Sequence, residues 1–135
     1  MITISRSGEH PLRNEHDIVL GRQMVRRLAQ EAGFSLVDQT KIVTAASELA
    51  RNALIYAGGG DLKWQTLTDG ARRGVRLCFE DHGPGIADAD RAMTDGWSSG
   101  TGLGLGLSGA RRLVNEFELQ STVGVGTRVT ITRWK

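Results

Sequence analysis

The sequence of 135 residues predicts an α/β fold, a two-layer sandwich in which helices cover one face of a mixed β-sheet. Two long segments in the first half carry apolar residues at helical spacing. Two pairs of alternating, β-branched segments follow, and a glycine-containing turn joins the members of each pair. With 39% hydrophobic and 24% charged residues, the composition is that of one globular domain covering residues 1–135.

The N-terminal half predicts a short strand, ITIS, followed by two capped helices. Asn14 is placed to cap a helix from Asn14 to Ala32, and Asp17 stands three residues on, as in a capping box. Ser35 and Asp38 repeat this relation at the start of a second helix, which we expect to reach Tyr56 or Ala57. A glycine follows each helix as a stop signal.

The second half predicts shorter elements. A hairpin is expected first, then a loop with one short helix, a third long helix and a closing hairpin. These elements are expected at Leu62–Thr68, Val75–Glu80, Ala89–Met93, Leu107–Phe117, Glu118–Val123 and Thr127–Trp134.

Composition excludes several classes of protein. The single Cys78, in the apolar run VRLCF, cannot form an internal disulfide, and we expect a buried, unreactive thiol. No apolar run is long enough to span a bilayer and no signal peptide is visible, so we expect a cytoplasmic protein without membrane contact. A net charge of +2 and arginine pairs without interleaved aromatic residues argue against nucleic-acid binding.

The segment GTGLGLGL places Gly100, Gly102, Gly104 and Gly106 at alternate positions immediately before a predicted helix. Glycines let backbone N–H groups approach an anion, and the positive end of the helix dipole favours it, so the segment predicts a phosphate-binding loop. It is no P-loop, because no Gly-Lys-Ser/Thr follows. Gly104, Gly106 and Gly109 also spell the dinucleotide-binding pattern G-x-G-x-x-G. That pattern needs a strand directly before it, and a loop is predicted there, so we reject a dinucleotide site.

Three further motifs contain side chains suited to a nucleotide site. Glu48 and Asn52, in SELARNALIYA, are four residues apart and share one face of the second helix. An amide oxygen such as that of Asn52 suits one ligand position on Mg²⁺, and a nearby carboxylate can accept a proton. Asp81, which begins DHGPG, closes a strand and can accept the amino proton of adenine. Thr127, in GVGT, starts the last strand, where its hydroxyl can share that site.

In this order and spacing, the four motifs resemble the N, G1, G2 and G3 boxes of the GHKL superfamily, which includes gyrase, Hsp90, histidine-kinase and MutL ATP-binding domains. The resemblance implies a Bergerat fold that binds ATP and Mg²⁺. Asp81 would recognise adenine and Asn52 would hold Mg²⁺, while the glycine loop surrounds the phosphates. The implied nucleotide-binding residues are Asn52, Asp81, Gly83, Gly85, Gly100, Thr101, Gly102, Leu103, Gly104, Leu105, Gly106 and Thr127.

Nearly the whole chain, from about Asp17 onward, resembles the RsbT-type serine/threonine switch kinases. This resemblance implies phosphorylation of a STAS-domain partner in a bacterial stress-signalling module, with Glu48 as the catalytic residue that accepts or orients the hydroxyl proton. Two alternatives stay open: an RsbW-type anti-sigma factor that sequesters a sigma factor, and an activator of a downstream phosphatase. Arg51 is either a γ-phosphate contact or an ion-pair partner of Glu48. Trp97 either covers the nucleotide, contacts a partner or packs on a helix.

Overall fold

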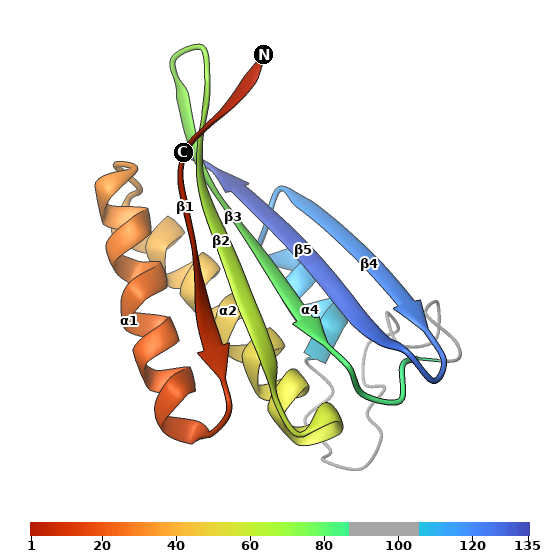
Figure 1. Cartoon of the computed structure of the whole chain (residues 1–135). Helices are drawn as coiled ribbons and strands as arrows, with labels where there is room; N and C mark the ends of the chain where they lie inside the picture. Colours follow the sequence, from red (N-terminus) through yellow and green to blue (C-terminus); the bar gives the residue numbers. More distant parts are fainter. Residues whose placement is uncertain (87–105) are drawn as a thin grey trace.

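The computed structural model describes residues 1–86 and 106–135, and Figure 1 shows how their elements are arranged. Two helices connect the first strand to the second, and a third, short helix precedes the last hairpin. The described elements are β1 (Ile2–Leu12), α1 (Glu15–Glu31), α2 (Leu36–Ala57), β2 (Gly60–Asp69), β3 (Arg72–Asp81), α4 (Gly106–Arg112), β4 (Glu116–Thr122) and β5 (Gly126–Trp134). The short helix expected over Ala89–Met93 lies outside the described residues.

The described strands form one sheet in the order β1-β2-β3-β5-β4, and every neighbouring pair is antiparallel. The expectation of a mixed sheet is therefore wrong. Helix α1 runs along the sheet in one direction and α2 returns, so β2 starts near the end of β1 and runs opposite to it (Figure 1). Strand β5 lies between β3 and β4, so these two strands, which run in the same direction, do not pair.

The capping side chains start both long helices, as the sequence predicts. The Asn14 Oδ1 accepts a hydrogen bond from the Asp17 backbone N–H at 2.9 Å, and the Ser35 hydroxyl oxygen accepts one from the Asp38 N–H at 3.2 Å. Helix α2 ends at Gly58, whose φ of 75° is a left-handed conformation that a side chain disfavours. Local sequence therefore sets the limits of both helices.

Two elements differ in length from their predictions. Strand β1 has 11 residues where only ITIS was expected; it is an edge strand, which tolerates Pro11 and a largely polar sequence. Helix α4 has seven residues and stops at Arg112, before the predicted end at Phe117. Phe117 lies instead in β4, where it packs against the core from the sheet, so pairing with β5 wins over helical continuation.

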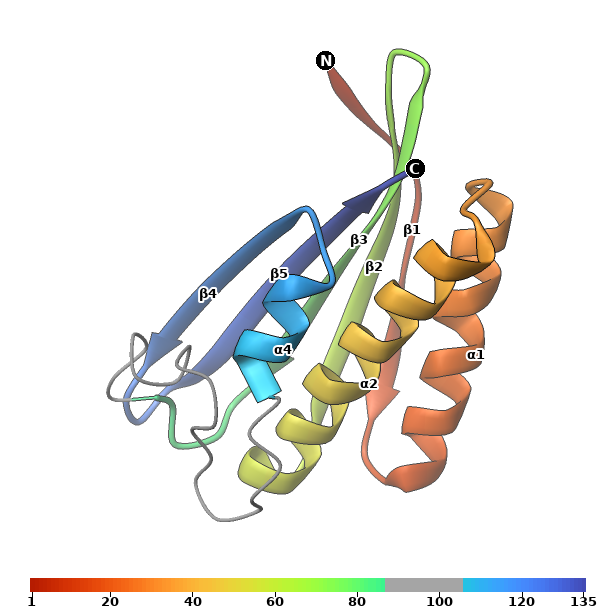
Figure 2. The same cartoon turned by 180° about the vertical axis from the view of Figure 1, so that it is seen from behind.

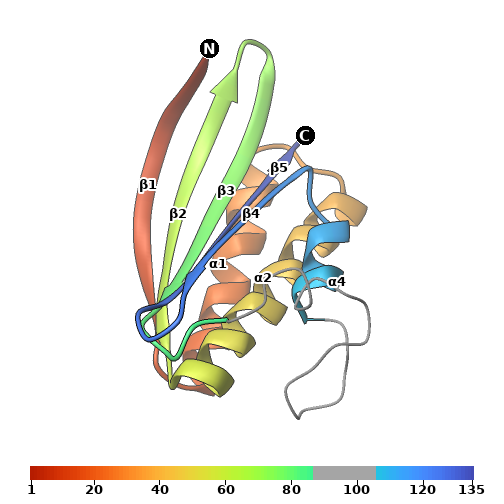
Figure 3. The ribbon, with the colours of Figure 1, turned by 90° about the vertical axis from the view of Figure 1, so that its right-hand side faces the viewer.

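Helices α1, α2 and α4 cover one face of the sheet, and the other face is open (Figures 2 and 3). The core between the layers includes Leu77 and Phe79 of β3 and Val129 and Ile131 of β5, which are all buried. This arrangement confirms the two-layer α/β sandwich. Trp134 is buried on the sheet, as expected for a strand residue, and Trp64 is half-buried. None of the described helices is long and apolar enough to cross a membrane.

Candidate functional site

Three polar side chains form a row across the end of the sheet. Asp81, the last residue of β3, pairs with Thr127 of β5, and Thr127 pairs with Ser121 of β4. Successive residues of a strand point to opposite faces, so this row lies on the same face as the adjoining row of core residues Phe79, Val129 and Leu119. The polar row therefore continues the hydrophobic core, and its residues are half-buried on the helix-facing side.

The Asp81 carboxylate is held by two backbone donors. Its Oδ1 accepts hydrogen bonds from the N–H groups of Gly83 at 3.0 Å and Thr127 at 3.2 Å. Among the described residues, no hydrogen bond ends on Oδ2. The two backbone donors therefore fix the orientation of the side chain through Oδ1, whereas Oδ2 accepts nothing from the part of the chain that the structure describes. An amino group next to a ring nitrogen, as in adenine, is a suitable donor for that oxygen.

The turn after β3 fits closely between the end of α2 and the β4–β5 hairpin. A Cβ built at Gly83 would lie 2.5 Å from the Cβ of Ala57, so this position has no room for a side chain. The Pro84 carbonyl accepts a hydrogen bond from the Gly124 N–H at 2.9 Å. Gly85, with a φ of +77°, lies against the Thr122 carbonyl. The two predicted glycines therefore hold the backbone close to both neighbours, beside Asp81.

Glu48 and Asn52 lie on α2, upstream of this turn. Both side chains are half-buried, and each is followed by a buried residue, so the pair lies beside the buried stripe of the helix. With a rise of 1.5 Å per residue, Asn52 is about 7.5 Å along the helix axis from Ala57, and Glu48 is one turn further. Among the described residues, no ion pair joins Arg51 to Glu48. A ligand that starts at Asp81 and follows α2 would reach Asn52 before Glu48.

The predicted phosphate loop is only partly described. Gly106 is the first residue of α4, which packs beside α2 (Figure 2). Trp97 and the rest of the predicted loop lie outside the described residues; that part of the loop is Gly100, Thr101, Gly102, Leu103, Gly104 and Leu105.

Ser121 is a member of the polar row that sequence reasoning missed. Its hydroxyl accepts a hydrogen bond from the Ile86 N–H at 2.7 Å and lies 2.8 Å from the Thr127 Oγ1. In the sequence, Ser121 is an ordinary serine near a hairpin turn, and it lies 40 positions after Asp81. Only the strand register identifies it, because the register places it directly beside Thr127.

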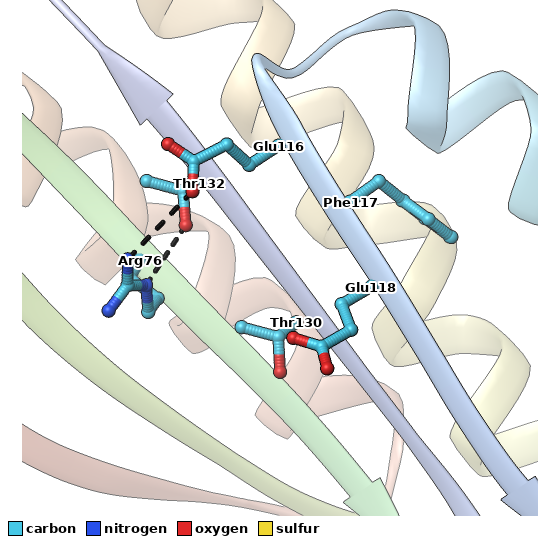
Figure 4. A pocket seen from close by; sticks show the side chains of 6 residues that line it. All are labelled: Arg76, Glu116, Phe117, Glu118, Thr130 and Thr132. Carbon is cyan, nitrogen blue, oxygen red and sulfur yellow. Dashed lines mark hydrogen bonds and ion pairs between the residues drawn. The ribbon is translucent and has the colours of Figure 1, made fainter.

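A hollow of about 540 Å³ lies on the open face of the sheet, away from all the predicted site residues. Figure 4 shows its lining residues, Arg76, Glu116, Phe117, Glu118, Thr130 and Thr132. The Arg76 Nε donates a hydrogen bond to the Thr132 Oγ1 at 3.0 Å, and its Nη2 lies 3.9 Å from the Glu116 carboxylate. Arg76, which is the cation among the lining residues, therefore already interacts with Thr132 and Glu116, and the Glu118 carboxylate accepts a hydrogen bond from the Gln120 side chain at 3.1 Å.

The predicted site residues fit a magnesium nucleotide. Asp81 offers a fixed acceptor for an amino group, and Asn52 offers one neutral oxygen near the same helix end. Among the described residues, no group of three or more His, Cys, Asp or Glu side chains is arranged to hold a metal ion. Mg²⁺ takes few protein ligands when phosphate oxygens and water supply the rest, so a single amide oxygen such as that of Asn52 suits it.

Known proteins share this architecture. The family model of histidine kinase-, DNA gyrase B-, and HSP90-like ATPases matches residues 37–135. Serine/threonine-protein kinase RsbT of Bacillus subtilis (strain 168) is 47% identical over 120 residues, which cover 89% of this chain and 90% of that protein.

A crystal structure of the RsbU and RsbW domains of Rv1364c from Mycobacterium tuberculosis aligns with a TM-score of 0.65 over 96% of this chain, at 20% identity. The chain spans 32% of that longer protein, and this likeness concerns the fold alone. The family model covers most of the chain, and the similarity to RsbT extends over nearly all of it. The chain therefore belongs to the histidine kinase-, DNA gyrase B- and HSP90-like ATPases, and within them to the RsbT-type serine/threonine protein kinases.

Proposed function

We propose that this chain, as one ATP-binding domain, transfers the γ-phosphoryl group of ATP to a serine or threonine of a STAS-domain partner in a partner-switching module. We place this activity in the cytoplasm. The single observation that carries the proposal is the similarity to serine/threonine-protein kinase RsbT over nearly the whole chain. The geometry of the polar row supports it, because the Asp81 Oδ2 has no partner among residues 1–86 and 106–135 and can accept a hydrogen bond from an adenine amino group.

Each predicted residue has a distinct task in this proposal. Asp81 accepts the adenine amino proton through Oδ2, while its Oδ1 stays bound to the backbone. Gly83 and Gly85 hold the turn close enough for its backbone to approach the base. Asn52 supplies the side-chain ligand to Mg²⁺, and the positive charge of the ion offsets the negative charge of the phosphates. The glycine-rich segment from Gly100 to Gly106 donates backbone N–H groups to phosphate oxygens.

Glu48 acts on the acceptor hydroxyl. In the proposed reaction a bond forms between the hydroxyl oxygen of the partner and the γ-phosphorus, and the bond from that phosphorus to ADP breaks. The hydroxyl proton goes to the Glu48 carboxylate, which acts as the general base. Phosphoryl transfer depends mainly on positioning and electrostatic stabilisation. One carboxylate and one side-chain ligand to the metal are therefore enough for the reaction.

The test incubates the purified chain with Mg-ATP and the STAS-domain protein encoded nearest to it, and records the intact masses of both proteins. The wild type is expected to add one phosphoryl group to the partner. Glu48→Ala is expected to bind ATP normally but to transfer about 10²- to 10⁴-fold more slowly, because a general base contributes that range. Asn52→Ala is expected to lose Mg²⁺-dependent binding as well.

Thr44→Ala is the matched control, since Thr44 lies one turn before Glu48 on α2 and is exposed. It should transfer at the wild-type rate. Normal transfer by Glu48→Ala would remove this residue from the catalytic role. If the wild type binds ATP but adds no phosphoryl group to the partner, the kinase proposal fails for that partner, and capture of a sigma factor or activation of a phosphatase becomes the next measurement.

A further inference from the structure

Two backbone N–H groups orient the Asp81 carboxylate, and they belong to two different segments. Gly83 lies in the turn that follows β3, and Thr127 lies at the start of β5. Each segment contains a glycine in a conformation that side chains disfavour, since φ is +77° at Gly85 and +146° at Gly126. Glycine has a wide conformational range. Contacts from outside these segments are therefore needed to hold the two donors in place.

The Ser121 side chain supplies contacts to both segments. Its hydroxyl oxygen accepts a hydrogen bond from the Ile86 N–H, at the end of the turn, at 2.7 Å. The same hydroxyl is a donor to the Gly126 carbonyl oxygen at 3.3 Å. It also lies 2.8 Å from the Thr127 Oγ1, so Ser121 is joined to this segment whichever of the two hydroxyls donates. One half-buried side chain of β4 thus connects the turn after β3 to the start of β5.

The contact with Gly126 acts on the same peptide unit that binds Asp81. The Gly126 carbonyl and the Thr127 N–H belong to one planar trans peptide, in which they point in opposite directions. The N–H donates to the Asp81 Oδ1 on β3, whereas the carbonyl oxygen is contacted by Ser121 from β4. Strand β5 lies between these two strands. The peptide plane is therefore held from both sides, which keeps its N–H directed at Asp81.

The turn after β3 is attached to the β4–β5 hairpin by two hydrogen bonds. The Gly124 N–H donates to the Pro84 carbonyl, and the Ile86 N–H donates to the Ser121 hydroxyl. The first bond joins two backbone groups, so only the second depends on a side chain. Loss of the Ser121 hydroxyl would remove this attachment, and the Gly83 N–H in the same turn would be held less firmly at Asp81.

We propose that Ser121 is a positioning residue for the Asp81 carboxylate. It holds the two backbone segments whose N–H groups fix Oδ1, and it thereby keeps Oδ2 in the orientation that accepts the amino group of adenine. The step to adenine rests on the proposed function, because it requires a nucleotide at Asp81. The hold on the two N–H groups is a property of the chain without ligand, so the two can be measured separately.

The first measurement is amide hydrogen exchange of the nucleotide-free chain, followed by NMR. In Ser121→Ala, the amides of Gly83 and Thr127 are expected to exchange about two- to tenfold faster than in the wild type, the range that one hydrogen bond provides. The Ile86 amide, which loses its acceptor, should also exchange faster. The amide of Leu28, a buried residue of α1, should keep its rate, which excludes a general loss of stability.

The second measurement compares two nucleotides by calorimetry, without any partner protein. Mg-ATP is compared with the magnesium complex of purine riboside triphosphate, which has a hydrogen atom in place of the 6-amino group. Ser121→Ala is expected to lower the preference for ATP about two- to tenfold, the change that one misdirected hydrogen bond produces, while the analogue keeps its affinity. A general loss of folding would weaken both nucleotides together. Ser121→Thr keeps a hydroxyl and should restore the wild-type ratio.

Thr122→Ala is the matched control, since Thr122 is the next residue of β4 and is exposed. It should keep both the exchange rates and the nucleotide ratio of the wild type. Should Ser121→Ala not fold, Ser121→Cys decides the question, because a thiol keeps the volume but is a weak donor and acceptor.

Unchanged exchange at Gly83 and Thr127, in a folded Ser121 variant without a hydroxyl, overturns the inference alone. Faster exchange with an unchanged nucleotide ratio overturns it too, because Asp81 would then recognise the base without help from Ser121. Absence of ATP binding in the wild type overturns the proposed function. Equal affinity of the wild type for both nucleotides overturns the role of Asp81 in that function, and the role of Ser121 with it.

Discussion

Two polar rows cross the same three strands, one on each face of the sheet, and they differ in what they leave unpaired. On the helix-facing side, Asp81, Thr127 and Ser121 lie side by side across β3, β5 and β4. On the open side, the row Arg76–Thr132–Glu116 occupies the equivalent positions further along the strands. Each row has a charged residue on β3 and a threonine on β5.

The charges of the open-face row interact with one another. Arg76 donates to Thr132 and lies beside Glu116, so a cation and an anion offset each other in one row (Figure 4). The helix-facing row has a carboxylate and no cation. Its Asp81 is held by backbone N–H groups through one oxygen, while the other oxygen has no partner among the described residues. A row of polar side chains therefore becomes a candidate site when its geometry leaves hydrogen-bonding capacity unused.

Exchange of the Asp81 carboxylate for an amide is expected to have the largest effect. In Asp81→Asn, one oxygen can still accept the two backbone N–H groups, so the fold should persist. The other end becomes an NH₂ donor that faces the adenine amino group, and ATP affinity should fall by about 10- to 150-fold, since hydrogen bonds to charged groups contribute about 1.5–3 kcal/mol. Calorimetry gives the affinity, and a thermal melt checks the fold.

Arg76→Gln is the control for that measurement, because it changes the charged residue of the open-face row on the same strand. Its ATP affinity should equal that of the wild type. If Arg76→Gln weakened ATP binding as much as Asp81→Asn does, the two rows would not differ in function, and the distinction drawn between them would be lost.

A smaller effect is expected where the turn after β3 meets α2. A side chain at Gly83 would collide with Ala57, so Gly83→Ala should overpack this contact by about 1–3 kcal/mol. For a domain of this size, the loss corresponds to a fall in melting temperature of roughly 3–10 °C. Adding Ala57→Gly removes the nearest clash and should restore part of the loss. An additive fall in the double variant would contradict this direct contact.

The smallest effect concerns Cys78, which lies on the open face between the two β-strand neighbours Lys63 and Thr130. The thiol is half-buried rather than buried as the sequence suggested, and burial is the main cause that raises its pKa. A raised pKa lowers the thiolate fraction at neutral pH, so iodoacetamide should alkylate Cys78 a few-fold more slowly than a free cysteine peptide. The rate should rise as the pH is increased through the raised pKa.

The same alkylation can separate the two faces of the sheet. Saturating Mg-ATP should leave the rate at Cys78 unchanged, because the proposed nucleotide site lies on the opposite face. Mass spectrometry of the modified chain measures the rate with and without nucleotide. Protection of Cys78 by ATP would place a nucleotide contact on the open face and would contradict the site assignment.

Short-range patterns were sufficient for the two long helices, α1 and α2. Asn14 and Ser35 accept the hydrogen bonds that their capping positions predict, since a cap depends only on residues a few positions away. Short-range patterns did not predict where β1 and α4 end, because strand pairing outweighs local propensity there. The mixed sheet was expected wrongly for a related reason: the direction of neighbouring strands depends on which strand is inserted between them, and β5 lies between β3 and β4.

Residue type and spacing identified Asp81, Gly83, Gly85 and Thr127 as one group, because a motif order typical of a family can be read along the chain. Their hydrogen bonds could not be read in that way. Which Asp81 oxygen is occupied, and which serine stands beside Thr127, follow from strand register and from the docking of the turn against α2. Register depends on contacts between residues far apart in sequence, and a shift of one residue moves every side chain to the other face of the sheet.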